Sequence, residues 1–140
     1  MDALSGVILH VDDDRSVRES LSALLQSVGY VVSSAASGTE AIQLANEGLR
    51  PDVLIVDFDL GPRMNGAEAA ERIHELLNYS PPIMMLSGNL ARAAFPRITE
   101  GIVWRGSKPF NPQLLLSALR NFVLLSRATR KLQSCRGVSV

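Results

Sequence analysis

The sequence predicts one α/β domain in which a parallel sheet is covered by helices on both faces. Short runs rich in β-branched residues alternate with helical patterns five times along the 140 residues, an alternation typical of repeated strand–helix units. Two of the runs, Val53–Asp57 and Ile83–Ser87, are apolar in every residue but the last. Strands of this composition are buried on both faces, as in the interior of a parallel sheet.

The five predicted strands are only three to five residues long. In chain order they are Val7–Val11, Tyr30–Ser34, Val53–Asp57, Ile83–Ser87 and Ile102–Trp104.

The first three predicted helices have clear end signals. The first carries apolar residues at spacings of three and four and ends at Gly29, a residue suited to a left-handed helix end. The second begins at Ser37, where Ser37 and Glu40 match a capping box. The third follows Asn65 and Gly66.

Two further helices are expected in the second half of the chain. One lies near Ala91–Glu100 and is interrupted by Pro96, which removes a helical hydrogen bond. The other begins with Asn111 as the N-cap residue and Pro112 at the first helical position, and it continues at least to Leu125.

Length and composition exclude several classes of protein. A chain of 140 residues, 46% hydrophobic and 20% charged, is expected to form one domain without a second globular unit. Its one cysteine cannot form an internal disulfide, and neither histidine lies at zinc-site spacing from it. No apolar run approaches the ~20 residues that span a bilayer, and the first residues form no signal peptide. We therefore expect a cytoplasmic protein without membrane contact.

The charge is unevenly distributed although the net charge is zero. Residues 1–75 carry 13 acidic and 5 basic side chains, whereas residues 76–140 carry 1 acidic and 9 basic ones. Two interpretations are open. The two halves neutralise each other in the fold, or the acidic side chains form a pocket at one pole.

Polar residues stand directly at or after the ends of four predicted strands. They are Asp12 to Asp14, Asp57 with Asp59, Ser87, and Lys108. Because ligands of doubly wound sheets bind outside the carboxyl ends of the strands, we expect these side chains to converge there. Acids at the start of a helix also have a simpler explanation, stabilisation of the helix dipole. The accompanying Asp57 and Lys108 favour a functional cluster.

The chemistry of this cluster predicts phosphoryl transfer. Clustered carboxylates repel one another unless a cation lies among them, and Mg²⁺ prefers oxygen ligands. Mg²⁺ takes only one or two carboxylates, which leaves Asp57 available as a nucleophile. Lys108 would neutralise phosphoryl oxygen charge, and Ser87 would donate a hydrogen bond.

The order of these residues resembles the receiver domain of bacterial two-component response regulators. The resemblance covers about residues 6–126 and rests on the stretches Ile8–Asp14, Pro51–Asp57, Met84–Gly88 and Ser107–Phe110. It implies a flavodoxin-like five-stranded parallel sheet with strand order 2-1-3-4-5 and five helices. The receiver domain would occupy residues 1–126, and residues 127–140 would be a basic extension that continues the last helix or is disordered.

The resemblance also implies roles for the residues of the cluster. Asp57 would be the phosphoacceptor, and a histidine kinase or a histidine-phosphotransfer protein would be the donor. Asp12, Asp13, Asp57 and the backbone carbonyl of Asp59 would hold Mg²⁺ as ligands or anchors. Ser87 and Lys108 would sense the phosphoryl group, and the peptide bond between Lys108 and Pro109 would be cis. Such a protein has no separate substrate and is not expected to be an enzyme in the usual sense.

Some features depart from the resemblance, and a second function stays open. The loop Asp59–Gly66 is one residue longer than the commonest form. Arg105 stands where many receivers have an aromatic residue, with Trp104 one place earlier. The alternative is a haloacid-dehalogenase-like phosphatase with Asp57 as its nucleophile, because Asp57 and Asp59 resemble that family's Asp-x-Asp motif. That motif, however, normally follows the first strand of its sheet.

The last predicted helix is too apolar for a single buried face. From Leu114 to Leu125, nine of twelve residues are apolar, more than one core-facing stripe requires. We expect a homodimer through this helix, with Leu116 and Val123 as candidate outer residues. Trp104 and Arg105 would belong to the same switch or partner surface. The basic extension alone offers only salt-sensitive affinity for nucleic acid, a partner that we do not expect.

Overall fold

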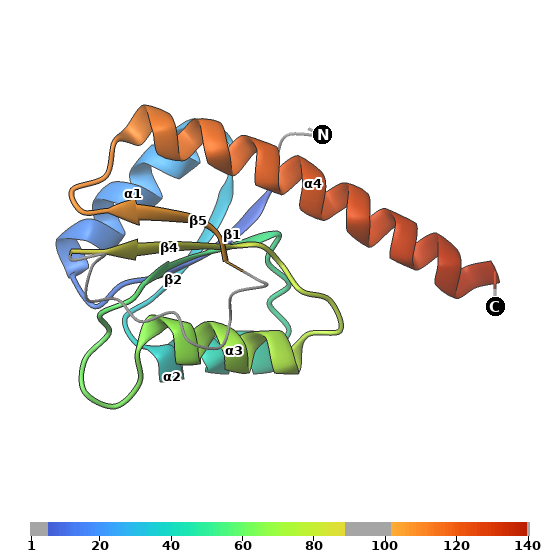
Figure 1. Ribbon diagram of the computed structural model, residues 1–140, viewed down its shortest axis with the longest axis horizontal. Coiled ribbons are helices and arrows are strands. Elements are labelled where there is room, and N and C mark those ends of the chain that lie inside the picture. Colours follow the sequence, from blue (N-terminus) through green and yellow to red (C-terminus); the bar gives the residue numbers. More distant parts are fainter. Residues whose placement is uncertain (1–5, 89–101, 140) are drawn as a thin grey trace.

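The computed structural model describes residues 6–88 and 102–139, which form a five-stranded parallel sheet between two helical layers (Figure 1). The strands are β1 (Val7–Val11), β2 (Val31–Ala35), β3 (Val53–Asp57), β4 (Ile83–Ser87) and β5 (Ile102–Ser107). Their order is β2-β1-β3-β4-β5, so the predicted sheet and strand order are confirmed. β2 lies one residue later than predicted, and β5 continues three residues further.

Helices α1 and α4 cover one face of the sheet, and α2 and α3 cover the other (Figure 1). Their bounds are α1 (Arg15–Ser27), α2 (Gly38–Asn46), α3 (Gly66–Leu76) and α4 (Pro112–Ser139). The helix predicted near residues 91–100 lies outside the described residues. The helix predicted from Pro112 is α4.

The central strand β3 separates two apolar layers. Its residues Val53 and Ile55 lie in the layer beneath α1 and α4, whereas Leu54 and Val56 lie in the layer beneath α2 and α3. Successive side chains of a strand point to opposite faces, so a strand covered on both sides must be apolar throughout. All five residues of β3 are buried, including Asp57 at its end.

Local sequence signals fix the helix ends. Asp14 caps α1 by accepting hydrogen bonds from the amides of the first turn. Asn65 and Glu68 form a reciprocal capping box at the start of α3. Gly29, just beyond α1, has φ 101°, a left-handed conformation that favours glycine.

α4 is far longer than the minimum predicted. It continues through the basic extension as far as Ser139, and its 28 residues span about 42 Å. Its first half lies on the sheet, and its second half projects past the amino ends of the strands (Figure 1). Residues 127–139 therefore continue this helix.

The prediction that Val123 lies on the outer side of this helix is wrong. Val123 is 1% exposed and shares the buried side of α4 with Leu115 and Leu119, at spacings of four residues. Leu116 is half-buried against the same layer. The exposed leucines of α4 are Leu114, Leu124, Leu125 and Leu132.

Ion pairs connect the acidic first half of the chain to the basic second half. Of the five charged contacts within the described residues, four join the two halves: Lys108–Asp12, Lys108–Asp57, Arg127–Asp52 and Arg130–Asp52. Mutual neutralisation and an acidic cluster at one pole thus occur together.

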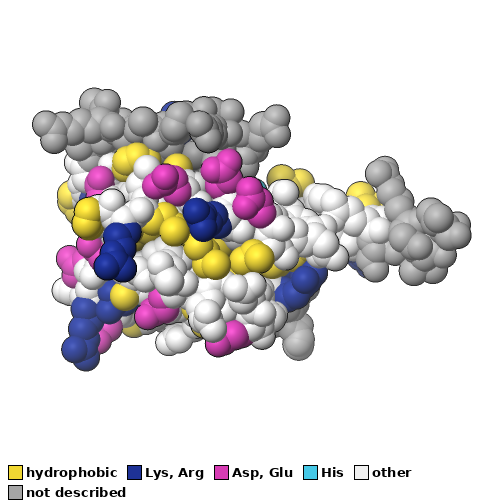
Figure 2. Space-filling model, turned by 90° about the horizontal axis from the view of Figure 1, so that it is seen from below, with side chains coloured by type: hydrophobic (Ala, Val, Ile, Leu, Met, Phe, Trp, Pro, Cys, Tyr) yellow, Lys and Arg dark blue, Asp and Glu magenta, His cyan; other side chains and the backbone are white. Residues whose placement is uncertain are grey.

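On the face formed by α2 and α3, apolar side chains lie in a narrow band between acidic and basic ones (Figure 2). No helix within residues 6–88 and 102–139 is long and apolar enough to cross a membrane.

Candidate functional site

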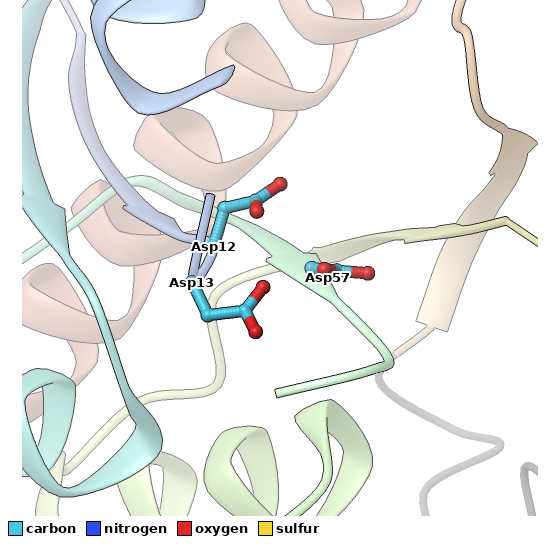
Figure 3. Close-up of side chains that lie close together, drawn as sticks. All are labelled: Asp12, Asp13 and Asp57. Carbon is cyan, nitrogen blue, oxygen red and sulfur yellow. The ribbon is translucent and has the colours of Figure 1, made fainter. Parts of the chain in front are cut away.

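Three carboxylates meet at the carboxyl ends of β1 and β3. Asp12 follows β1 and is 0% exposed, Asp13 is exposed beside it, and Asp57 ends β3 at 3% exposure. One oxygen from each lies within 4.8 Å of the others, and the three side chains point toward a common space (Figure 3). The sheet topology thus brings together residues that lie 45 positions apart in the sequence.

Lys108 bridges two of these carboxylates. Its Nζ lies 2.7 Å from Asp12 Oδ2 and 3.1 Å from Asp57 Oδ2. The Lys108 amide donates to the carbonyl oxygen of Ser87 at 3.0 Å, which fixes the lysine to the end of β4. The peptide bond between Lys108 and Pro109 is cis, as the resemblance implied.

Hydrogen bonds from two backbone amides and from the Arg18 side chain hold Asp12 and Asp57 in place. Asp12 Oδ1 accepts the Asp14 amide at 2.9 Å, and Asp57 Oδ1 accepts the Asp59 amide at 3.2 Å. Arg18 Nη1 donates to the Asp12 carbonyl oxygen at 2.9 Å. Asp14 itself caps α1, so the helix-capping explanation holds for Asp14, whereas Asp12 and Asp13 face Asp57.

Burial controls the electrostatics of the site. Desolvation raises the pKa of Asp57 to about 6, although the Lys108 ammonium opposes the shift. Burial alone would lower the pKa of Lys108, but the hydrogen bonds and charges of Asp12 and Asp57 outweigh it and raise that pKa. Lys108 is therefore cationic at neutral pH, and Asp57 is mostly deprotonated.

Close packing fixes the start of α3 against the end of β3. A Cβ atom at Gly66 would collide with the carbonyl oxygen of Asp57, so only glycine fits there. The Gly66 amide also donates to the Phe58 carbonyl oxygen at 2.8 Å, which closes the base of the predicted long loop. The tip of that loop, residues 61–63, is exposed.

Ser87 is 1% exposed at the end of β4, where it pairs in register with Ser107. Among the described residues, a Cβ atom at the following Gly88 would meet nothing within 4 Å. Trp104 is half-buried in the apolar layer beneath α1 and α4, where its ring lies over Gly106. Arg105, the next residue of β5, is exposed. Trp104 therefore does not substitute for the aromatic residue that many receiver domains have at the position of Arg105.

A second charged cluster, which no sequence pattern indicated, lies at the amino ends of the strands. Asp52, just before β3, is 2% exposed and pairs with Arg130 at 2.8 Å and Arg127 at 3.7 Å. Arg127 and Arg130 are three residues apart on α4, a spacing that puts them on one helix side. Their partner lies 78 positions from Arg130, and sequence spacing alone cannot identify so distant a contact.

His74 also has a contact that the sequence did not indicate. Its Nε2 lies 2.8 Å from the Pro81 carbonyl oxygen, which links the end of α3 to the segment before β4. This contact is structural.

Comparisons with known proteins agree on one family. The profile of the response regulator receiver domain matches residues 8–120. Response regulator MprA of Mycobacterium leprae (strain TN) is 33% identical over 113 residues, which cover 81% of this chain and 49% of that protein. MprA of Mycolicibacterium vanbaalenii is 34% identical over 122 residues, 87% of this chain and 51% of the relative. The chain thus spans about half the length of these curated relatives.

Solved structures show the same fold. A CheY-like response regulator receiver domain protein from Methanospirillum hungatei JF-1 has a TM-score of 0.77 at 28% identity, covering 89% of this chain and 98% of that one. A putative response regulator from Chloroflexus aurantiacus J-10-fl has a TM-score of 0.70 at 35% identity, covering 85% and 98%.

The phosphatase alternative does not agree with these matches. Asp57 ends the third strand in chain order, not the first, and the matched family spans residues 8–120. The sheet order, the carboxylate cluster with its lysine and the sequence match lead to the same conclusion: the chain belongs to the response regulator receiver family of two-component systems.

Proposed function

We propose that Asp57 accepts a phosphoryl group from a histidine kinase or a histidine-phosphotransfer protein in a Mg²⁺-dependent reaction. The observation that carries this proposal is the position of Asp57 at the end of the central strand, within 3.1 Å of Lys108 Nζ and beside two further carboxylates. The phosphorylated domain would act through protein contacts.

The carboxylates of Asp12, Asp13 and Asp57 fit a hard divalent cation. All three offer oxygen, the three oxygens lie within 4.8 Å of one another, and the set combines buried with exposed groups. The backbone carbonyl of Asp59 would be a further ligand. Bound Mg²⁺ would neutralise the charge of the phosphoryl oxygens and orient the group toward Asp57.

The residues of the chain account for the remaining chemistry. A carboxylate oxygen of Asp57 bonds to phosphorus while the phosphorus–nitrogen bond of the donor phosphohistidine breaks and the imidazole leaves. A pKa of about 6 keeps Asp57 mainly in the nucleophilic form at neutral pH. Lys108 Nζ, now held by Asp12 and Asp57, would pair with a phosphoryl oxygen, and the Ser87 hydroxyl would donate a hydrogen bond to another.

Intact-mass measurement after incubation with acetyl phosphate and Mg²⁺ tests this function. We expect one added phosphoryl group on the wild-type protein and none on Asp57→Asn. Asp14→Asn is the matched control, because asparagine caps helices as well as aspartate does, and it should be phosphorylated like the wild type. Unchanged phosphorylation of Asp57→Asn would contradict the assignment.

We also infer that a second copy of the chain binds along α4. Leu114, Leu125 and Leu132 are 63%, 59% and 62% exposed. With Ala118, Asn121 and Ala128 they form a stripe whose spacing alternates between four and three residues, the repeat by which two helices pack together along their length. A repeat of this kind is complementary to itself, so an identical helix is the partner that it fits best.

A further inference from the structure

A pocket of about 770 Å³ lies at the amino-terminal edge of the sheet, at the opposite end of β3 from Asp57. The second half of α4 forms one side of this pocket, and the starts of β1 and β3 and the segment after α3 form the other. Its lining residues include Arg50, Arg127, Arg130 and Lys131. The pocket is therefore separate from the Asp12, Asp13 and Asp57 site.

The lining is strongly cationic. Among the described residues that line the pocket, there are four basic side chains and one carboxylate, that of Asp52. This carboxylate is already engaged in the fold, because it accepts the Val7 amide at 2.8 Å and pairs with Arg130 and Arg127. Asp52 is 2% exposed and is not offered to a ligand. The charge that the pocket presents is consequently positive.

Two of the guanidinium groups are held in place by neighbouring side chains. The Arg130 guanidinium lies 4.2 Å from the centre of the Tyr79 ring, and that of Arg50 lies 4.9 Å from it. Arg50 Nη2 donates to Asn78 Oδ1 at 2.8 Å, and the Tyr79 hydroxyl donates to the Pro51 carbonyl oxygen at 2.7 Å. Because these groups are ordered beforehand, a ligand loses less binding free energy in fixing them.

The chemistry and size of the pocket indicate its ligand. Guanidinium and ammonium groups together recognise phosphate oxygens, to which arginine donates in pairs. The volume lies within the ~300–1,000 Å³ of small-molecule sites and exceeds what a single phosphate fills. Tyr79 is 8% exposed, so its ring is not available for stacking on a nucleobase. We propose that the pocket binds a small anion with two or more linked phosphate groups through Arg50, Arg127, Arg130 and Lys131.

Calorimetric titration with pyrophosphate tests this site. The titration is made with EDTA, because without a divalent cation the carboxylate cluster around Asp57 repels anions and cannot contribute. We expect saturable binding of pyrophosphate that is at least tenfold tighter than that of orthophosphate at equal ionic strength. ADP would bind as tightly as pyrophosphate if only the phosphates are recognised, and more tightly if a nucleoside diphosphate is the natural ligand.

Arg50→Gln combined with Lys131→Gln should weaken pyrophosphate binding at least tenfold and leave the Asp52 ion pairs intact. The matched control combines Arg72→Gln with Arg120→Gln, two exposed arginines outside this pocket. Equal weakening in both double variants, no saturable binding, or tighter binding of an acidic peptide than of pyrophosphate would overturn the proposal. Phosphorylation of Asp57 does not depend on this site, so the two proposals fail separately.

Discussion

Two buried titratable residues, Asp57 at the end of β3 and His10 in β1, affect stability in opposite directions. Burial raises the pKa of Asp57 to about 6 and lowers that of His10 to about 4. Folding therefore favours the protonated form of Asp57 and the neutral form of His10. As the pH rises from about 4 to about 6, the contribution of Asp57 to stability falls while that of His10 rises. The two dependences largely cancel in the wild-type protein.

Asp57→Asn separates the two effects. Asparagine resembles the protonated aspartate, so the variant and the wild type should be similarly stable near pH 4 in the absence of divalent cations. Above pH 6 the variant should be more stable, by on the order of 2–3 kcal/mol, because it no longer buries a charge. Urea unfolding at several pH values in EDTA measures this difference, and a difference that does not grow with pH would show that burial is not its cause.

Two sets of contacts hold α4 on the rest of the fold. Leu115, Leu119 and Val123 pack its first half on the sheet, and Asp52 holds its continuation through Arg127 and Arg130. An isolated helix end frays readily in water. The Asp52 ion pairs thus extend the ordered part of α4 beyond its apolar contacts.

Asp52→Asn should loosen this continuation. Removing one member of a buried ion pair leaves charge without a partner, which costs about 3–5 kcal/mol where both groups are buried. Because the two arginines are partly exposed, we expect a loss of about 2 kcal/mol and faster hydrogen exchange over residues 127–133. The control is Glu19→Gln, which breaks the exposed Arg15–Glu19 pair and should change stability by under about 0.5 kcal/mol. Equal effects of the two variants would argue against a stabilising role of the Asp52 ion pairs.

Helix α4 carries two apolar sides. One side of α4 is buried in the core, and the other carries the exposed stripe of Leu114, Leu125 and Leu132. Soluble monomers seldom leave a contiguous apolar surface exposed. Association along this stripe would place two receiver domains beside each other.

Light scattering at micromolar concentration should give the mass of a dimer. Leu125→Asp combined with Leu132→Asp should give a monomer, because each dimer would bury four unpaired carboxylates. Leu76→Asp, at a residue of α3 that is 46% exposed, should leave the dimer intact. Because Arg105 replaces the usual switching aromatic residue, we expect the mass to change little with phosphodonor. A monomeric wild type under both conditions would refute the dimer.

The sequence predicted best those features that depend on strand ends. Asp12, Asp57 and Lys108 could be grouped because parallel strands bring their carboxyl ends to one edge, and the structure places all three within ion-pair distance. The burial of Val123 could not be predicted, because a helix that is apolar on several sides has no unique inner face. The Asp52 contacts depend on where α4 crosses the sheet, which local patterns do not encode.

The closed base of the loop between β3 and α3 has a consequence for protein engineering. The Gly66 amide bonds to the Phe58 carbonyl oxygen, so residues 59–65 form a ring whose ends are fixed independently of its length. The entropic cost of closing such a ring grows only slowly, by about 0.6 kcal/mol for each doubling of its length. A peptide tag inserted between Pro62 and Arg63, at the exposed tip, should therefore leave the sheet undisturbed.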